Sequence, residues 1–327
     1  MMDRRTPLWL LRKVVARTAG EDRMLQRLMT RNGIKVISHS GPLVRHSPIP
    51  SVAWIPDFQH VHLPGLFTGQ ERQVRDRYFM DLCTRSDQII VSSQCARLDL
   101  ESFAPQHAHK AQVLHFVASP RDPGAVPPLS ALQQRYQFDG RFFLLPNQFW
   151  AHKNHRLVID ALALLKQRRQ RVLVLATGGA EDHRNPDFFK SLMAYAAQCN
   201  VLEEFRVLGV IPFDDLSGLM LHAVALINPS RFEGWSTSVE EAKSLGKLML
   251  LSDIPVHREQ APARGIYFPL DDPESLAQTL TSALLEFDPD SEPRHVDAAR
   301  AHLLDRQTEF AQIYQRIVLS ARASSIS

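Results

Sequence analysis

Cysteine is scarce in this sequence of 327 residues, which has only three, Cys83, Cys95 and Cys199. Their spacing matches no metal-ligand pattern, and an odd number of thiols cannot build the paired framework of a disulfide-rich domain. The scarcity excludes a disulfide-stabilised scaffold and favours a reducing compartment. We therefore expect a cytoplasmic protein.

Long hydrophobic runs are absent as well. No stretch of about 18 apolar residues is present, so the sequence predicts no helix that crosses a membrane. The segment RRTPLWLLRKVVART, residues 4–18, joins basic residues to a short apolar block and lacks the small-residue cleavage site of a signal peptide. We expect an amphipathic helix there, either packed on the protein or lying in a lipid interface. The second alternative allows peripheral association with the cytoplasmic face of the inner membrane.

Neither sign of charge dominates, since 38 lysine and arginine residues stand against 35 aspartate and glutamate residues, with a formal net charge of +3. This balance excludes the concentrated basic surface of a nucleic-acid-binding protein, so no nucleic-acid partner is expected. Anionic small molecules and acidic lipid surfaces stay compatible with the charge. The 44% hydrophobic and 22% charged residues are typical of a folded globular protein.

Segments rich in β-branched residues alternate with helical patterns, which predicts parallel sheets flanked by helices. Residues 119–130 contain four prolines and can continue neither a helix nor a central strand. We place a domain boundary there, which gives domains at 1–122 and 123–300 and a closing helix at 301–327. In the first domain, the predicted strands are residues 34–40, 51–56, 88–93 and 111–117, with a helix in 69–87.

The second half repeats the alternation and predicts a doubly wound sheet, in which ligands bind beyond the carboxyl ends of the strands. Its predicted strands are residues 141–146, 171–177, 205–211, 224–230, 247–253 and 265–270. Its predicted helices begin at Asn154, near Asp187, around Leu216, after Trp235 and at Pro273.

The segment NPSRFEGWSTSVEEAKSLGK, residues 228–247, combines features of an anion site. Gly234 permits a tight turn, and residues 236–238 are serine or threonine N-cap candidates for the next helix. The unpaired N–H groups of a helix N-terminus suit a phosphate. Glu233 in the loop and Glu241 on the helix are expected to face one cleft, where carboxylates accept hydroxyl donors. A ligand with both phosphate and vicinal hydroxyl groups, such as a nucleotide sugar, would use all of these groups.

A purely local role for these carboxylates is the alternative. Thr237 with Glu240, or Ser238 with Glu241, fits a capping box, in which the glutamate only satisfies a backbone donor.

A second segment, NQFWAHKNH at residues 147–155, leads from a predicted strand into a helix whose predicted N-cap is Asn154. Lys153 would lie at the carboxyl end of the strand, where an ammonium can neutralise a diphosphate as a point charge. The alternative is a solvated loop lysine. His152 and His155 are predicted to be surface residues at the helix start rather than ligands.

Together, PSRFEGWSTSVEEAKSLGK, NQFWAHKNH and SDIPVHREQ resemble glycosyltransferase family 4. The most specific element is the E-x7-E spacing from Glu233 to Glu241. The likeness covers nearly the whole second half, and WIPDFQHVHLP, ERQVRDRYF and IIVSSQCARLDL extend it through much of the first. The resemblance implies the GT-B architecture, α/β with two facing Rossmann-like domains that have doubly wound parallel sheets, here with a shortened N-terminal domain on the acceptor side.

The resemblance also implies a retaining, metal-independent transfer of a sugar from a UDP- or GDP-sugar to a glycan, a lipid-linked acceptor or another hydroxyl group. Polysaccharide or glycolipid synthesis at the cell surface is the expected setting. Glu241 would hold the ribose hydroxyls and Glu233 the donor sugar, while Lys153 and the backbone at Ser236 and Thr237 would meet the diphosphate. Further donor-binding candidates from the matching motifs are Gly234, Asn147, Gln148 and Arg231.

Three departures from the family pattern affect these expectations. Gln148 stands where an arginine is frequent, and Arg231 is the candidate substitute. Pro56 precedes Asp57 where a histidine is common, which makes His60 the candidate catalytic histidine and His62 the second choice. A basic helix also opens the chain in place of a strand and a glycine-rich loop, so the first domain is either naturally short or incomplete.

No cofactor and no metal ion are expected beside the nucleotide sugar. The sequence DPD, residues 288–290, is the only Asp-x-Asp, and its acidic, proline-containing setting predicts a surface linker. Two other functions stay open at this point. One is a non-catalytic protein that binds nucleotide sugars or glycans, and the other is a nucleotide-sugar epimerase of similar architecture.

Overall fold

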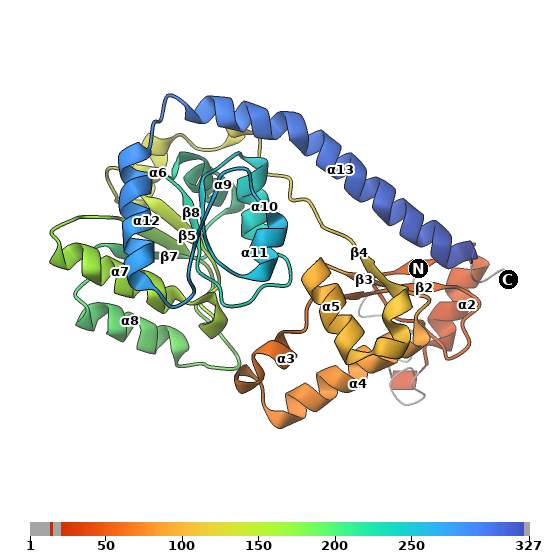
Figure 1. Ribbon diagram of the computed structural model, residues 1–327. Coiled ribbons are helices and arrows are strands. Elements are labelled where there is room, and N and C mark those ends of the chain that lie inside the picture. The colour runs from red at the N-terminus through yellow and green to blue at the C-terminus, as the bar shows by residue number, and fades with distance from the viewer. Residues whose placement is uncertain (1–13, 16–20, 324–327) are drawn as a thin grey trace. The chain divides into compact units, whose positions relative to one another are not determined.

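The computed structural model describes residues 14–15 and 21–323. Of the N-terminal helix predicted in residues 4–18, only Val14 and Val15 fall within that range, and both are helical. The chain forms two compact units (Figure 1). The first contains the described residues up to 116 together with those from 308 on, and the second is continuous from 117 to 307.

The first unit has a sheet of four parallel strands in the order β1-β2-β3-β4. Its strands are β1 (Ile37–Ser38), β2 (Ser51–Ile55), β3 (Gln88–Val91) and β4 (Ala111–Val113). Its helices are α2 (Arg23–Arg31), α3 (Gln59–His62), α4 (Gly69–Arg85) and α5 (Gln94–Phe103), with the 3-10 turns η1 (Pro64–Leu66) and η2 (Pro105–Lys110).

The two faces of this first sheet are covered by different parts of the chain. Side chains alternate between the faces of a strand. Ala53 and Ile55 of β2 therefore pack with α4 and α5 on one face, whereas Val52 lies on the other. There Val52 meets Ile317 and Ala321, which belong to the last helix, α13 (Glu292–Ala323). Described residues from before position 117 and from after position 307 thus both contribute to the first unit.

The second unit has six parallel strands in the order β10-β9-β8-β5-β6-β7. They are β5 (Phe143–Pro146), β6 (Val174–Thr177), β7 (Phe205–Gly209), β8 (Leu226–Asn228), β9 (Met249–Ser252) and β10 (Gly265–Phe268). The helices are α6 (Leu129–Tyr136), α7 (His155–Gln167), α8 (Phe188–Gln198), α9 (Phe213–His222), α10 (Thr237–Ser244), α11 (Pro255–Gln260) and α12 (Pro273–Glu286), with the 3-10 turns η3 (Pro123–Ala125) and η4 (Ala151–Lys153).

Alternation along the central strand β5 divides the core of this unit into two layers. Phe143 and Leu145 pack with α7, α8 and α12, while Leu144 packs with α6, α9 and α10 on the opposite face. The strand order reverses between β5 and β8, which are neighbours in the sheet. Doubly wound sheets bind ligands at this reversal. Two α/β units with parallel sheets are what the sequence predicts.

Local capping explains where several helices begin. Thr68 and Glu71 form a capping box at the start of α4, and Ser93 accepts a hydrogen bond from the Ala96 N–H at the start of α5. Asp272 does the same for Ser275, with Pro273 in the first position of α12. These starts follow from the sequence alone.

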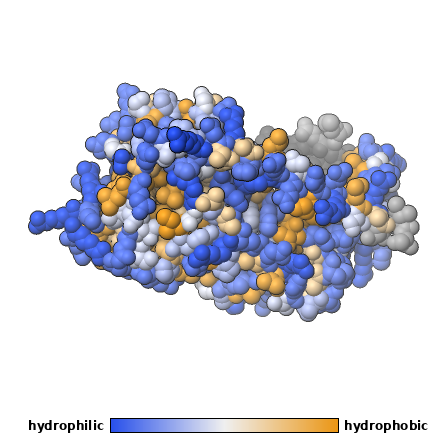
Figure 2. All heavy atoms as spheres, turned by 45° about the horizontal axis from the view of Figure 1, so that its top comes forward, coloured by the Kyte–Doolittle hydropathy of each residue, from blue (hydrophilic) through white to orange (hydrophobic). Residues whose placement is uncertain are grey.

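The surface contains both hydrophobic and hydrophilic residues. On the face shown in Figure 2, hydrophobic residues form small groups among hydrophilic ones, as is normal for folded proteins. Within residues 14–15 and 21–323, no helix is both long and apolar enough to cross a membrane.

Candidate active site

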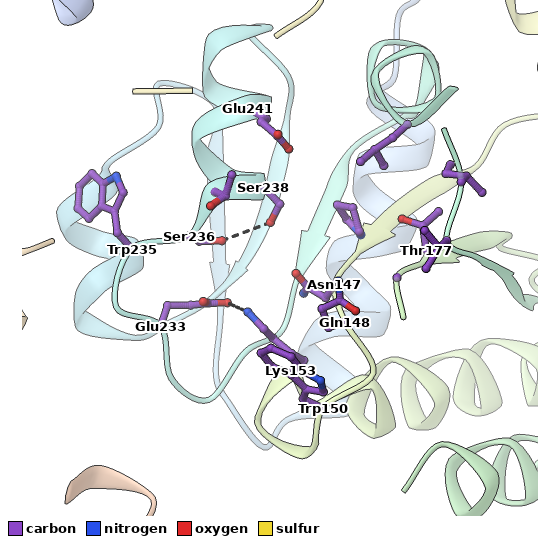
Figure 3. A pocket seen from close by; sticks show the side chains of 16 residues that line it. Asn147, Gln148, Trp150, Lys153, Thr177, Glu233, Trp235, Ser236, Ser238 and Glu241 are labelled. Atoms are coloured by element: carbon purple, nitrogen blue, oxygen red, sulfur yellow. Dashed lines mark hydrogen bonds and ion pairs between the residues drawn. The ribbon is translucent and has the colours of Figure 1, made fainter. Parts of the chain in front are cut away.

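A cavity of about 410 Å³ lies at the carboxyl edge of the second sheet, where the strand order reverses (Figure 3). The loops after β5, β6 and β7 line it together with the segment that leads from β8 into α10. The lining residues are Pro146, Asn147, Gln148, Trp150, Lys153, Thr177, Gly178, Val210, Ile211, Leu216, Glu233, Trp235, Ser236, Thr237, Ser238 and Glu241.

The first turn of α10 leaves backbone donors at this cavity. Ser236 is the N-cap, and no side chain caps the helix. The N–H groups of Thr237 and Ser238 have no hydrogen-bond partner among the described residues. The N–H of Ser236, in contrast, donates to Oε1 of Gln260 at 3.3 Å. Two amides at the positive end of the helix dipole are therefore left for a ligand.

Neither of the capping boxes considered for α10 forms. Glu240 turns its carboxylate to Gln260 and Arg306. The half-buried carboxylate of Glu241 has no partner within the described part of the chain, and burial raises its pKa. In Figure 3 this carboxylate points from α10 towards the strands, into the cavity, whereas Trp235 points away from the other labelled side chains.

Lys153, at the end of η4, forms an ion pair with Glu233 inside the cavity (Figure 3). Nζ of Lys153 donates to Oε1 of Glu233 at 2.6 Å, and the two side chains are only 13% and 9% exposed. Burial acts to raise the pKa of Glu233, but the Lys153 ammonium, with His257 and a hydrogen bond from Ser230, outweighs it and lowers the pKa to about 2. Glu233 is therefore ionised at neutral pH.

Asn147 and Gln148 fix the loop after β5. Nδ2 of the buried Asn147 donates to Asn228 at 3.3 Å, and Asn228 in turn donates to Oγ of Ser236 at 2.9 Å. Oε1 of Gln148 accepts from the Gly179 N–H at 2.6 Å. The side-chain carbonyl of Gln148 is thus occupied by the loop after β6. In the family that the sequence resembles, an arginine is frequent at this position.

The prediction that His152 and His155 lie on the surface is wrong, since they are 5% and 0% exposed. His155 belongs to the buried stripe of α7 that includes Val158 and Leu162, and its ring stacks on Phe149 at 4.5 Å between centroids. Burial lowers the pKa of His155 to about 3 and, with help from Lys153, that of His152 to about 4. Both rings are neutral supports of the Lys153 loop.

Four of the predicted residues do not line the cavity. Arg231 directs its guanidinium to Asp271 at 2.5 Å, and Gly234 lies in the loop before α10. His60 and His62 belong to α3 of the first unit.

His60 is held inside its own unit. Its ring is buried, its Nε2 lies 3.1 Å from Oδ1 of Asp76, and it packs edge-on against Phe79. Burial, followed by the charge of Arg75, lowers the pKa of His60. A role for His60 in catalysis stays a prediction.

Several residues that line the cavity were not predicted from the sequence, among them Trp150, Thr177, Gly178, Val210, Ile211 and Leu216. A signal existed for one of them, because Gly178 directly follows a strand end. It has φ +140°, and a Cβ there would lie 2.4 Å from the carbonyl oxygen of Asn147. Only glycine lets the β6 loop approach the β5 loop so closely.

The residues that the structure describes contain no group of three or more His, Cys, Asp or Glu that could hold a metal ion. Asp288 and Asp290 lie in an exposed turn before α13, where Oδ1 of Asp288 accepts from the N–H of Asp290. Neither residue lines the cavity.

The family is decided by a sequence model described as glycosyl transferases group 1, which matches residues 133–300, about half of the chain. The chain belongs to the glycosyl transferases group 1 family. The matched range contains every residue that lines the cavity. A comparison with curated proteins gives no match.

Solved structures of glycosyltransferases share the fold of this family member, which is GT-B, as the sequence predicts. The glycosyltransferase from Rickettsia africae has a TM-score of 0.70 and 15% identity, over 97% of this chain and 83% of that one. Anabaena HepE in complex with UDP-glucose has a TM-score of 0.68 and 18% identity, over 97% and 84%. WaaG, a glycosyltransferase involved in lipopolysaccharide biosynthesis, has a TM-score of 0.64 and 18% identity, over 90% and 80%.

Proposed function

We propose that this glycosyltransferase binds a nucleotide sugar in the cavity of its second unit and transfers the sugar, with retention, to a hydroxyl acceptor. One observation carries the proposal. The partner-free amides of Thr237 and Ser238 and the partner-free carboxylate of Glu241 line the same cavity. Phosphate suits the amides, and vicinal hydroxyls suit the carboxylate.

In this proposal the diphosphate meets the start of α10 and Lys153. Lys153 now pairs with Glu233, so a phosphate oxygen would join or replace that carboxylate at the ammonium. Glu233 would then accept hydrogen bonds from hydroxyls of the donor sugar, and Glu241 from those of the ribose. These roles come from the family resemblance, and the short distance between Lys153 and Glu233, 2.6 Å, is consistent with them.

Retention would proceed by front-face departure and attack, with the leaving phosphate taking the proton of the acceptor. Such a step needs no dedicated protein base, and its rate depends on positioning and on stabilising the charge that develops on the diphosphate. The amides of α10 and the Lys153 ammonium would supply that stabilisation.

The donor and acceptor classes are suggested by the structural relatives. HepE is bound to UDP-glucose, which favours a UDP-sugar over a GDP-sugar here. WaaG acts in lipopolysaccharide biosynthesis, which favours a glycan or lipid-linked acceptor and a setting at a membrane surface.

Thermal unfolding with added nucleotides tests the donor site. A nucleoside diphosphate that binds should stabilise the protein by about 2.7 kcal/mol at a hundredfold excess over Kd. UDP and GDP are compared with uridine and guanosine, which lack the phosphates that α10 would hold. The proposal would be rejected if no nucleoside diphosphate raised the unfolding temperature.

A non-catalytic binding protein is the second candidate, and the scarcity of cations favours it. Lys153 is the one lysine or arginine among the lining residues, and Glu233 already neutralises it. Slow release of free sugar and nucleoside diphosphate from an intact donor would exclude this candidate. A changed donor sugar without any acceptor would instead indicate an epimerase.

A further inference from the structure

A second buried carboxylate lies on α10, outside the cavity lining. The Glu240 side chain is 1% exposed. Its Oε1 accepts from Nε2 of Gln260 at 3.1 Å, and its Oε2 pairs with the guanidinium of Arg306, on α13. Because burying a carboxylate is unfavourable unless it is paired and hydrogen-bonded, Glu240 depends on both partners.

Gln260 uses its remaining hydrogen-bonding capacity on one residue of the cavity. The side chain ends α11 and is fully buried. Its Oε1 accepts from the N–H of Ser236 at 3.3 Å, and its Nε2 also donates to the Ser236 carbonyl oxygen at 3.1 Å. One amide side chain thereby holds both backbone groups of the N-cap residue.

We propose that Arg306, Glu240 and Gln260 are positioning residues that orient the first turn of α10 towards the donor diphosphate. The inference rests on the proposed function of the cavity. Arg306 holds Glu240, Glu240 holds Gln260, and Gln260 holds Ser236, the residue directly before the two partner-free amides. None of the three positioning residues lines the cavity.

The three positioning residues act on the first turn of α10, because packing already holds the rest of this helix in place. Val239, Ala242 and Leu245 are buried in the core layer shared with α6 and α9. Hydrogen bonds weaken steeply when donor and acceptor are misaligned. A loosened first turn should therefore weaken contacts to phosphate while contacts to the nucleoside persist.

The test compares the affinity for a nucleoside diphosphate with that for its nucleoside, in the full chain, by titration calorimetry. The ligand is whichever of UDP and GDP the wild type binds. Gln260→Met keeps the side-chain length and removes both bonds to Ser236, and Arg306→Met removes the cation from Glu240. We expect each to weaken diphosphate binding roughly tenfold and to change nucleoside binding less than about twofold. Arg306→Lys, which keeps a cation, should recover most of the loss.

Arg264→Met is the matched control. Arg264 also pairs with a glutamate of the second unit, Glu292, at 2.9 Å, and neither residue lines the cavity. This variant should lose stability without a change in the ratio of the two affinities. The ratio is informative even for a destabilised variant, because a smaller folded fraction reduces both affinities equally.

Two results would overturn the inference while the proposed function stands. One is an equal loss of nucleoside and diphosphate affinity in the Gln260 and Arg306 variants. The other is an unchanged affinity for both ligands. A wild type that binds no nucleoside diphosphate would reject the proposed function, and the inference with it.

Discussion

Lys153 and Glu233 neutralise each other at a place where both side chains are largely buried. Once the diphosphate arrives, the ammonium has to serve two anions, and the carboxylate becomes available to sugar hydroxyls. The pair as a whole is thus neutral before the donor binds, and the carboxylate of Glu241 is the other charged group of the cavity lining. It also makes Lys153 responsible for keeping Glu233 ionised.

Removing Lys153 should reverse the pKa shift of Glu233. In Lys153→Met the burial persists while the cation is gone, so the pKa of Glu233 should rise above its ordinary value of 4.5 instead of lying at about 2. A depressed pKa in the folded state gives stability that is complete above pH 4.5 and is lost as the pH falls towards 2. Carboxyl titration by NMR measures the pKa of Glu233. Denaturation between pH 2 and 7 measures the pH-dependent part of the stability, which is on the order of 3 kcal/mol for the wild type. A Glu233 that still titrates near pH 2 in the variant would contradict this account.

Glu241 should be important for binding and unimportant for stability. Its carboxylate is half-buried and has no partner in the described part of the chain, so folding gains little from it. We expect Glu241→Gln to weaken nucleotide binding about tenfold, the loss of a charge-assisted hydrogen bond, without lowering the melting temperature. The exposed Glu203 of the same unit provides the control variant Glu203→Gln. A destabilised Glu241→Gln with normal affinity would show that the carboxylate has a structural role.

At the scale of elements, the close approach of the β5 and β6 loops shapes one wall of the cavity. Gly178→Ala would place a Cβ 2.4 Å from the carbonyl oxygen of Asn147, so the two loops must separate. We expect a loss of about 2 to 3 kcal/mol in the free energy of unfolding, together with weaker nucleotide binding.

Gly140→Ala is the matched control for this substitution. Gly140 also has a positive φ, +71°, but nothing lies within 4 Å of its added Cβ. It should therefore lose only the backbone preference, about 1 kcal/mol, and leave nucleotide binding unchanged. Equal effects of the two substitutions would mean that the contact with Asn147 does not shape the site.

The order of strands and helices in the second unit could be predicted because each element carries its own periodicity and end signals. The strand β8, the turn at Gly234 and the helix α10 follow one another as the sequence indicates. Burial in the connections could not be predicted in the same way. His152 lies in a turn, η4, which has no periodic pattern, whereas His155 could have been assigned to the buried stripe of α7.

Interactions between segments that are far apart in the chain could not be predicted from the sequence. Nothing in the sequence around Glu240 indicates that Arg306, on another helix, holds its carboxylate. The capping box was the local alternative, and it could be rejected only once the partners of Glu240 were known. Likewise, Gln148 could be recognised as a departure from the family, but not as the acceptor of the Gly179 N–H.

At the scale of the whole molecule, we expect transfer to proceed without a divalent ion. The proposed charge stabilisation comes from amides and Lys153, and the one Asp-x-Asp of the sequence lies away from the cavity lining. Donor hydrolysis in metal-free buffer should be unchanged by a chelator. A loss of turnover that magnesium or manganese restores would refute this expectation.

Removing residues 308–327 should damage the first unit and spare the donor site. This segment supplies Ile317 and Ala321, which cover Val52 and Ile90 of the first sheet. A chain that ends at Gln307 should expose this apolar face, bind a hydrophobic dye and still bind nucleotide. Unimpaired stability of the shortened chain would mean that the contact with α13 contributes little.

Because one face of the first sheet is covered by α13, the order in which the chain is synthesised differs from the order in which the units can assemble. The second unit is built from the continuous segment 117–307, whereas the earlier strands must wait for residues 308–323 to be synthesised. Until then, the nascent chain carries an uncovered apolar surface on which chaperones can act.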